Sequence, residues 1–218
     1  GNFTIGDTVD CGVKRVAVRG AGMGITTLKL SNSANTSLIN FGNSTTVTGG
    51  GGLYNLTING NSANNTSGLG LRIQGCTDID IVNVYATDFD LEGIYIDGAS
   101  GKTAAIVRIH GCRITGNKRH GIFRGQYVEN VTITNSTIDA NGTAGNAFCG
   151  LFLYGSSSDL VSNCVISGSL GPNIWLHNVN QAFFSNVYSL SAGYEDYRFT
   201  GSTANICVIG GNVHSCSG

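Results

Sequence analysis

The sequence is poor in charged residues. Asp, Glu, Lys and Arg make up 11% of the 218 residues, only one Pro, one Trp and one Met occur, and the net charge is −1. Helical proteins normally carry much more Glu, Lys, Ala and Leu, so this composition argues against a helical fold. Lys and Arg form no run longer than a pair, such as Lys118–Arg119, which disfavours a nucleic-acid partner. No apolar run approaches 18 residues, so no membrane span is expected.

Small and bend-forming residues take the place of charge. There are 33 Gly, and Asn, Ser and Thr recur throughout, while 41% of the residues are hydrophobic, which argues against disorder. Gly and Asn suit tight bends. The seven Cys match no metal-binding spacing and are expected to be small buried side chains, so no metal ligands are assigned. The chain begins at Gly1 without Met, and we expect it to be a piece of a longer protein.

A short strand pattern recurs along the last two thirds of the chain. Successive copies begin 23, 28, 29, 23 and 24 residues apart, and each alternates apolar and polar positions, which is typical of a strand with one buried face. The copies are Gly-Leu-Arg-Ile at 70–73, Gly-Ile-Tyr-Ile at 93–96, Gly-Ile-Phe-Arg at 121–124, Gly-Leu-Phe-Leu at 150–153, Asn-Ile-Trp-Leu at 173–176 and Tyr-Arg-Phe-Thr at 197–200.

A second strand lies between these copies and contains a bend. The bend residues are Asn83, Gly111, Asn135, Asn163, Asn186 and Gly210. Such units bury their apolar faces only by stacking, about 4.8 Å apart, with parallel pairing between coils. The sequence therefore predicts a right-handed, single-stranded parallel β-helix of about eight coils as one domain over 1–218, irregular over 1–69 and regular over 70–218.

Two segments resemble a known family. Residues 19–30, Arg-Gly-Ala-Gly-Met-Gly-Ile-Thr-Thr-Leu-Lys-Leu, and 162–168, Ser-Asn-Cys-Val-Ile-Ser-Gly, look like coils of the pectate-lyase-like β-helix family, which includes phage tailspikes and polysaccharide-degrading enzymes. The resemblance implies a polysaccharide partner, an extracellular or virion-surface location and a possible homotrimer. The chain lacks the Asp-Asp pair of polygalacturonases, so no catalytic residue is carried over from the family.

The repeat places aromatic residues in one outward column. Sugars stack on aromatic faces, so this column predicts a polysaccharide-binding groove. A contact surface between subunits is the alternative, because exposed apolar patches often mark interfaces. The column reads Arg72, Tyr95, Phe123, Phe152, Trp175 and Phe199.

Titratable residues gather just before the recurring strand. The preceding column reads Glu92, His120, Cys149, Pro172 and Asp196, and the catalytic candidates are Glu92, Asp90, His120, Arg119 and Lys118. Asp90 and Glu92, about 6.6 Å apart if both lie on one strand, are a carboxyl pair that a glycoside hydrolase could use. A lyase would instead take Lys118, Arg119 or His120 as its base and could use Ca²⁺ to neutralise a uronate. A solvated patch of paired charges is the third interpretation.

Further residues are expected to bind substrate on both sides of the aromatic column. They are Tyr95, Asp97, Phe123, Phe152, Tyr154, Trp175, His177, Glu195 and Asp196. Glu92 and Asp196 are four coils, or about 19 Å, apart and cannot act on one bond. The leading hypothesis is a β-helix that binds and cleaves an extended, possibly acidic polysaccharide, with no required cofactor. The alternative is a non-catalytic segment of a trimeric fibre or tailspike.

Overall fold

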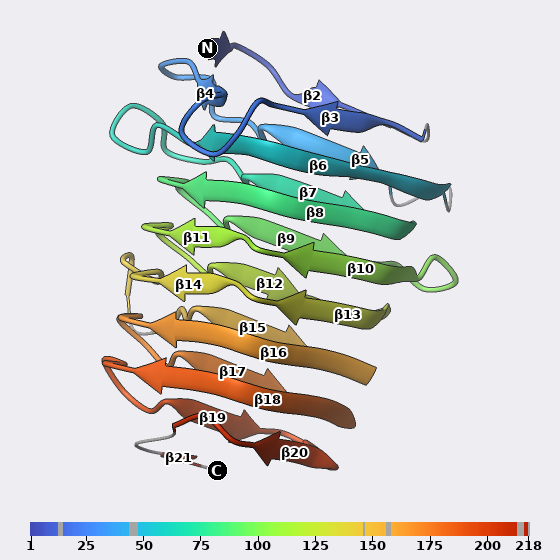
Figure 1. Ribbon diagram of the computed structural model, residues 1–218, viewed down its shortest axis with the longest axis vertical. Coiled ribbons are helices and arrows are strands. Elements are labelled where there is room, and N and C mark those ends of the chain that lie inside the picture. Colours follow the sequence, from blue (N-terminus) through green and yellow to red (C-terminus); the bar gives the residue numbers. More distant parts are fainter. Residues whose placement is uncertain (13–14, 44–47, 146, 156–157, 213–215, 218) are drawn as a thin grey trace.

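The computed structural model describes residues 1–12, 15–43, 48–145, 147–155, 158–212 and 216–217. All of its regular elements are strands, and they form two parallel sheets that wind together into a rod of stacked coils (Figure 1). The twelve-stranded sheet faces the viewer in Figure 1 and the nine-stranded sheet lies behind it. The predicted parallel β-helix is confirmed, and the eight steps between the nine strands match the expected eight coils.

The nine-stranded sheet contributes one short strand to each coil. In sheet order its strands are β2 (Val9–Asp10), β5 (Ile39–Gly42), β7 (Leu71–Gln74), β9 (Ile94–Asp97), β12 (Ile122–Arg124), β15 (Leu151–Tyr154), β17 (Ile174–His177), β19 (Tyr197–Thr200) and β21 (Cys216–Ser217).

The twelve-stranded sheet contains longer, bent strands, two of which are split at the bend. They are β1 (Asn2–Ile5), β3 (Ala17–Arg19), β4 (Thr27–Leu30), β6 (Thr48–Asn59), β8 (Cys76–Thr87), β10 (Ala104–His110), β11 (Arg113–Thr115), β13 (Val128–Thr134), β14 (Thr137–Asp139), β16 (Ser158–Ser167), β18 (Gln181–Leu190) and β20 (Ile206–Ile209).

The bends of this sheet adopt the left-handed backbone conformation. All six bend residues expected from the sequence have φ between 52° and 67°, a conformation that Gly and Asn tolerate best. Side-chain amides bond from coil to coil at these bends, as between Asn83 and Asn55 at 3.0 Å and between Asn186 and Asn163 at 3.3 Å. Asn also serves the interior, where the buried Asn117 amide donates to Asn141 at 2.8 Å.

Inward side chains of successive coils form one continuous apolar core. Ile94, Ile122, Leu151 and Ile174 occupy one register column, and each is fully buried. Of the cysteines with described side chains, five are buried, as expected, and Cys207 in the last long strand is exposed.

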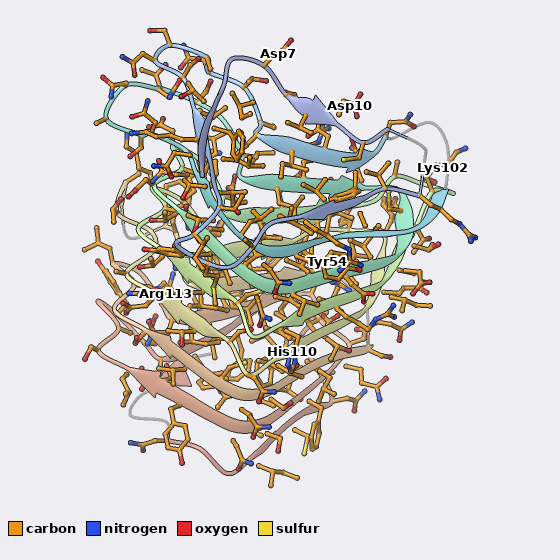
Figure 2. The ribbon with its side chains drawn as sticks, turned by 45° about the horizontal axis from the view of Figure 1, so that its top comes forward. Asp7, Asp10, Tyr54, Lys102, His110 and Arg113 are labelled. Atoms are coloured by element: carbon orange, nitrogen blue, oxygen red, sulfur yellow. The ribbon has the colours of Figure 1, made fainter. Side chains whose placement is uncertain are left out.

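Among the coils from β7 to β19, two are longer than the others, and their extra residues lie in turns rather than strands. The register of β8 with β10 places the first insertion in the turn 98–103, between β9 and β10. The register of β14 and β15 places the second insertion in the turn 140–150. The first turn follows the C-terminal end of a short strand, and the second precedes the N-terminal end of another. The two turns therefore lie beyond opposite ends of the strands of the nine-stranded sheet. Figure 2 shows Lys102 of the first turn projecting from the side of the rod.

Candidate functional site

Four aromatic rings form a row on the outer face of the nine-stranded sheet. Tyr95, Phe123, Phe152 and Trp175 are register partners on β9, β12, β15 and β17, and they alternate with core residues. Their ring centroids lie 4.8, 5.4 and 4.9 Å apart, close to the spacing between strands. Each ring is half-buried. The aromatic row is therefore a continuous strip of partly exposed aromatic side chains across four coils.

The row ends at an arginine on each side, and here one sequence expectation is wrong. Arg72 is the register partner of Tyr95, as expected. The register partner of Trp175, however, is Arg198, while Phe199 points inward and packs against the core. The last step is 23 residues rather than 24, and a slip of one residue in a strand turns every side chain to the other face. The Arg198 guanidinium lies 5.1 Å from the Trp175 ring centroid.

Because of the same one-residue shift, Asp196 does not take the outer position that the sequence predicted. Its side chain is buried, and its carboxylate accepts hydrogen bonds from Ser189 at 2.9 Å and Asn173 at 3.3 Å. Glu195 takes the expected outer position and pairs with Arg198 at 2.9 Å. Asp196 therefore supports the turn from inside, and its expected contact with substrate is wrong for this fold.

His120 lies beside the aromatic row, near the N-terminal ends of the strands that carry it. Its ring stacks on Phe152, with centroids 4.9 Å apart, and meets Phe148 edge-on at 5.3 Å. Its Nδ1 accepts the backbone N–H of Cys149 at 3.1 Å, which places the ring proton on Nε2. Burial, helped by Arg119, lowers the pKa of His120 to about 3. Such a neutral, weakly basic imidazole is poorly suited to remove a proton from substrate.

His120 also contacts the sulfur of Cys149, at 3.2 Å. A Cys–His contact is the arrangement of cysteine nucleophiles, but those thiols have a lowered pKa and are accessible. Cys149 is fully buried, and burial raises the pKa of its thiol well above the usual value. The pair is therefore a structural contact inside the turn.

The expected acidic patch divides into two parts. Asp90 and Glu92 lie in the turn between β8 and β9, not on one strand as predicted. Asp90 forms an ion pair with Lys118, whose ammonium also donates to the Ser62 carbonyl. Glu92 is buried, and burial raises the pKa of its carboxyl against the opposing effect of Arg119. Asp90 and Lys118 neutralise each other, which leaves Glu92 as the distinctive carboxyl of this turn.

Arg119 is exposed, and its guanidinium lies 5.4 Å from the Phe148 ring centroid. Phe148 belongs to the second insertion, whose backbone is held by hydrogen bonds from Gly142 to Arg119 and from Ala144 to Lys118, both at 2.8 Å. The insertion thus covers His120 and explains its burial.

Asp97 lies at the opposite edge of the aromatic row, where the strands end. It accepts a hydrogen bond from the Tyr95 hydroxyl at 3.1 Å. Burial raises the pKa of the Asp97 carboxyl and raises that of Tyr95 to about 12. A Cβ on Gly125 would lie 2.5 Å from the Asp97 carboxylate, so this glycine makes room for the acid. Asp97, Tyr95, Phe123 and Gly125 line an open pocket of about 270 Å³.

The remaining expected residues extend this edge across later coils. Tyr154 and His177 have ring centroids 5.3 Å apart. His177 and the Trp175 indole N–H both bond the Thr200 hydroxyl, each at 2.8 Å. The structure therefore places Tyr154, Trp175 and His177 on one surface with the aromatic row.

The sequence reasoning missed a buried ion pair beneath the site. Arg124 occupies an inward position of β12, is fully buried, and lies 3.4 Å from the Asp159 carboxylate. Its guanidinium also donates to the backbone carbonyls of Tyr154, Gly155 and Val128. The signal was present, because Arg124 stands where the other coils have Ile96 and Leu153. Arg124 thus fixes the corner that follows Tyr154.

A separate charged cluster lies on the twelve-stranded sheet. Arg108 pairs with both Asp78 and Asp80, Tyr54 donates to Asp80 at 3.4 Å, and the Arg19 guanidinium is 4.0 Å from the Tyr54 ring centroid. Tyr54, labelled in Figure 2, lies on β6 of this sheet, whereas the aromatic row lies on the nine-stranded sheet. The opposite charges of this cluster pair with each other, and none of the expected site residues belongs to the cluster.

Two general features of the described residues bear on ligands and membranes. Nowhere in the described part of the chain do three or more His, Cys, Asp or Glu side chains come together as a metal site would require. Ca²⁺ as an aid to a lyase stays a prediction. No helix among these residues is long and apolar enough to cross a membrane.

Comparison with solved structures places the fold among phage and polysaccharide-related proteins. The pre-mature gene product 12 of bacteriophage phi29 superposes with a TM-score of 0.78 at 18% identity over 92% of this chain and 30% of that protein. The tailspike protein gp49 of Pseudomonas phage LKA1 gives 0.60 at 17% identity, over 100% and 47%. The catalytic domain of a GH87 alpha-1,3-glucanase gives 0.54 at 11%, over 100% and 64%. This chain therefore spans about a third to two thirds of these proteins, and the likeness concerns the fold.

Sequence comparison gives the family. No curated protein sequence matches the chain significantly. The family model for the right handed beta helix region matches residues 70–218, which are the residues predicted to form regular coils. Because this match covers more than half of the sequence, the chain belongs to the right-handed β-helix family.

Proposed function

We propose that the chain binds an extended polysaccharide along the aromatic row and hydrolyses it beside Tyr95. The observation that carries the proposal is the row itself, four neighbouring and partly exposed rings on one face. Three steps of the strand spacing give the row a length of roughly 15 Å. Flat apolar rings with polar groups at their edges are suited to the faces of sugar rings.

Carboxyl groups with a raised pKa support hydrolysis. Glu92 and Asp97 lie on opposite edges of the row, and burial raises the pKa of each. A carboxyl that keeps its proton nearer neutral pH can protonate a glycosidic oxygen while water attacks the sugar carbon, and the proton lost by water restores the acid. Asp97 lines the open pocket, so we assign it the acid role. Glu92 is buried and lies five residues away beyond the other end of β9, about 16 Å along an extended chain, which is too far for it to act on the same bond.

Lyase chemistry is the weaker candidate at this site. It requires a base that removes a proton from the sugar. The pKa of His120 is lowered to about 3, and Lys118 is paired with Asp90. The weak basicity of His120 and the ion pairing of Lys118 therefore favour hydrolysis over elimination.

An extracellular or virion-associated location, and a homotrimer, belong to the same proposal, because the phage proteins share the fold.

The test measures binding and cleavage separately on a panel of soluble polysaccharides. Affinity electrophoresis reports binding, and release of reducing ends reports hydrolysis. Trp175→Ala should weaken binding about tenfold, the equivalent of about 1.4 kcal/mol of stacking. Asp97→Asn should retain binding and lose most hydrolysis, whereas Glu92→Gln should retain both.

Tyr188→Ala is the matched control, since Tyr188 is an aromatic residue that is 50% exposed on the other sheet. Equal binding by Trp175→Ala and the wild type would overturn the row as binding site. Binding without release by the wild type would leave a non-catalytic fibre module, and light scattering would then be expected to show a trimer.

A further inference from the structure

A pocket opens beside the aromatic row at the corner where β9 and β12 end. One hollow, of about 270 Å³, is lined by Tyr95, Asp97, Phe123 and Tyr154. A second, of about 380 Å³, is lined by residues that include Glu129 and Asn178. Gln126 and Tyr127 line both, so the two hollows adjoin at these residues, and we call them together the corner pocket.

The backbone of the corner leaves little freedom to the residues that line it. A Cβ on Gly98 would lie 2.2 Å from the Tyr127 carbonyl oxygen, so the two turns touch. Tyr127 has φ of 54° and is 49% exposed. A bulky aromatic residue in the left-handed conformation is uncommon and strained. The corner holds the Tyr127 ring outward, in reach of a ligand in the pocket.

The polar groups of the corner pocket are suited to hydroxyl groups. Gln126 donates to the Tyr154 hydroxyl at 2.7 Å, and the Tyr95 hydroxyl donates to Asp97 at 3.1 Å. Asp97 and Glu129 are acidic, and no Lys or Arg is found among the described lining residues. Arg124 lies beneath the floor but donates to backbone carbonyls and pairs with Asp159. Arg72 acts on Asp97 electrostatically but is not among these lining residues. A ligand carboxylate would meet Asp97 and Glu129 with no cation in the described lining, so the lining disfavours uronates.

The position of the pocket indicates what part of a polysaccharide reaches it. The aromatic row crosses four coils, whereas the corner pocket meets it only at Tyr95 and Phe123. Asp97 is two residues beyond Tyr95, so the pocket lies to the side of the row, about 6.6 Å along the strand. A main chain that follows the row would pass the pocket, and a substituent on one of its sugars would point into it.

We propose that the corner pocket binds an uncharged sugar that branches from the polysaccharide main chain, stacked on Tyr127 and hydrogen-bonded by Gln126. This inference rests on the proposed function, because it takes the aromatic row as the site of the main chain. It adds the substrate class, a branched polysaccharide with neutral branches.

The test is an array of oligosaccharides in which each main chain is present in three forms: unbranched, with a neutral hexose branch, and with a uronate branch. The wild type should bind the neutral-branched form about threefold to tenfold more tightly than the unbranched form, as expected for one stacked ring with its hydrogen bonds. The uronate-branched form should bind no better than the unbranched form.

Two variants separate this inference from the proposed function. Tyr127→Asn keeps a residue that tolerates the left-handed conformation and removes the ring, so it should abolish the preference for branches and leave unbranched binding unchanged. Trp175→Ala should weaken all forms alike. Binding of all three forms with equal affinity would overturn the branch site alone. Failure of the wild type to bind any form would overturn the proposed function and this inference with it.

Discussion

Acid should destabilise this protein strongly through one side chain, His120. Burial lowers its pKa from 6.5 to about 3. A histidine with a depressed pKa binds its proton more readily in the unfolded chain, so stability is lost as pH falls below the unfolded value of 6.5 and the loss continues to about 3. Each pH unit of this interval corresponds to about 1.4 kcal/mol. Between pH 6.5 and pH 4.5, His120 should therefore remove about 2 kcal/mol from the free energy of unfolding, because the unfolded-state histidine is already half protonated at pH 6.5.

The assay is equilibrium unfolding in urea at about pH 4.5 and about pH 6.5, followed by far-ultraviolet circular dichroism. His120→Asn offers an acceptor near the position of Nδ1, which receives the Cys149 N–H, and it cannot titrate. The wild type should lose about 2 kcal/mol more than this variant between the two pH values. Contributions of other groups, such as Glu92, occur in both proteins and cancel in the difference. If both proteins show the same pH dependence, His120 is not buried in its neutral form and the reasoning is refuted.

Three further predictions follow from contacts around the site. Gly125→Ala should displace the Asp97 carboxylate, because the new Cβ would lie 2.5 Å from it; we expect a loss of about 1–3 kcal/mol in thermal unfolding and a matching loss of hydrolysis. Asp159→Asn should cost about 3–5 kcal/mol in urea unfolding, because it leaves the Arg124 guanidinium buried without a counter-charge. Glu92→Gln should stabilise the protein at pH 7 relative to the wild type, because a raised carboxyl pKa means that stability is lost as pH rises through it.

Each of these predictions has its own control. Gly6→Ala should be nearly neutral, because its Cβ would meet nothing closer than 3.9 Å. Joint replacement of Arg124 and Asp159 by Leu should cost less than Asp159→Asn alone, since no charge is then left buried. The gain from Glu92→Gln should disappear near pH 3, where the wild-type carboxyl is also protonated. A constant gain across that range would contradict burial of the ionised Glu92.

The sequence was sufficient for the coil because strand, bend and core repeat together. The bend positions, such as Asn83 and Asn163, were predicted correctly, since a left-handed residue followed by a buried small one is a distinctive pattern. The last coil was misjudged by one residue. Tyr197, Arg198 and Phe199 alternate plausibly in either frame, because an aromatic side chain suits both the core and the outer row, and only pairing with β17 decides between them.

The site was harder to predict than the coil because burial of titratable groups depends on the turns. His120 and Glu92 were predicted as catalytic candidates, with a solvated charged patch as the alternative, yet both are buried. Phe148, which helps cover His120, comes from an insertion outside the repeat, where periodicity gives no information. The burial of Arg124 was likewise not predicted, because charged side chains rarely point into the core. Gln126 and Tyr127 were not singled out, since they follow the repeat and match no motif.

The two inserted turns have a consequence for how such a protein can change. The register of the strands resumes after each insertion, so the turn 98–103 lengthens one corner without altering the coils above and below it. Contacts in a solenoid are confined to neighbouring coils, and the stability of the core is therefore largely independent of corner length. Ligand preference could thus diversify through insertions and deletions at the corners, at little risk to folding. The same property makes this corner a suitable position for grafting loops of new specificity onto an unchanged rod.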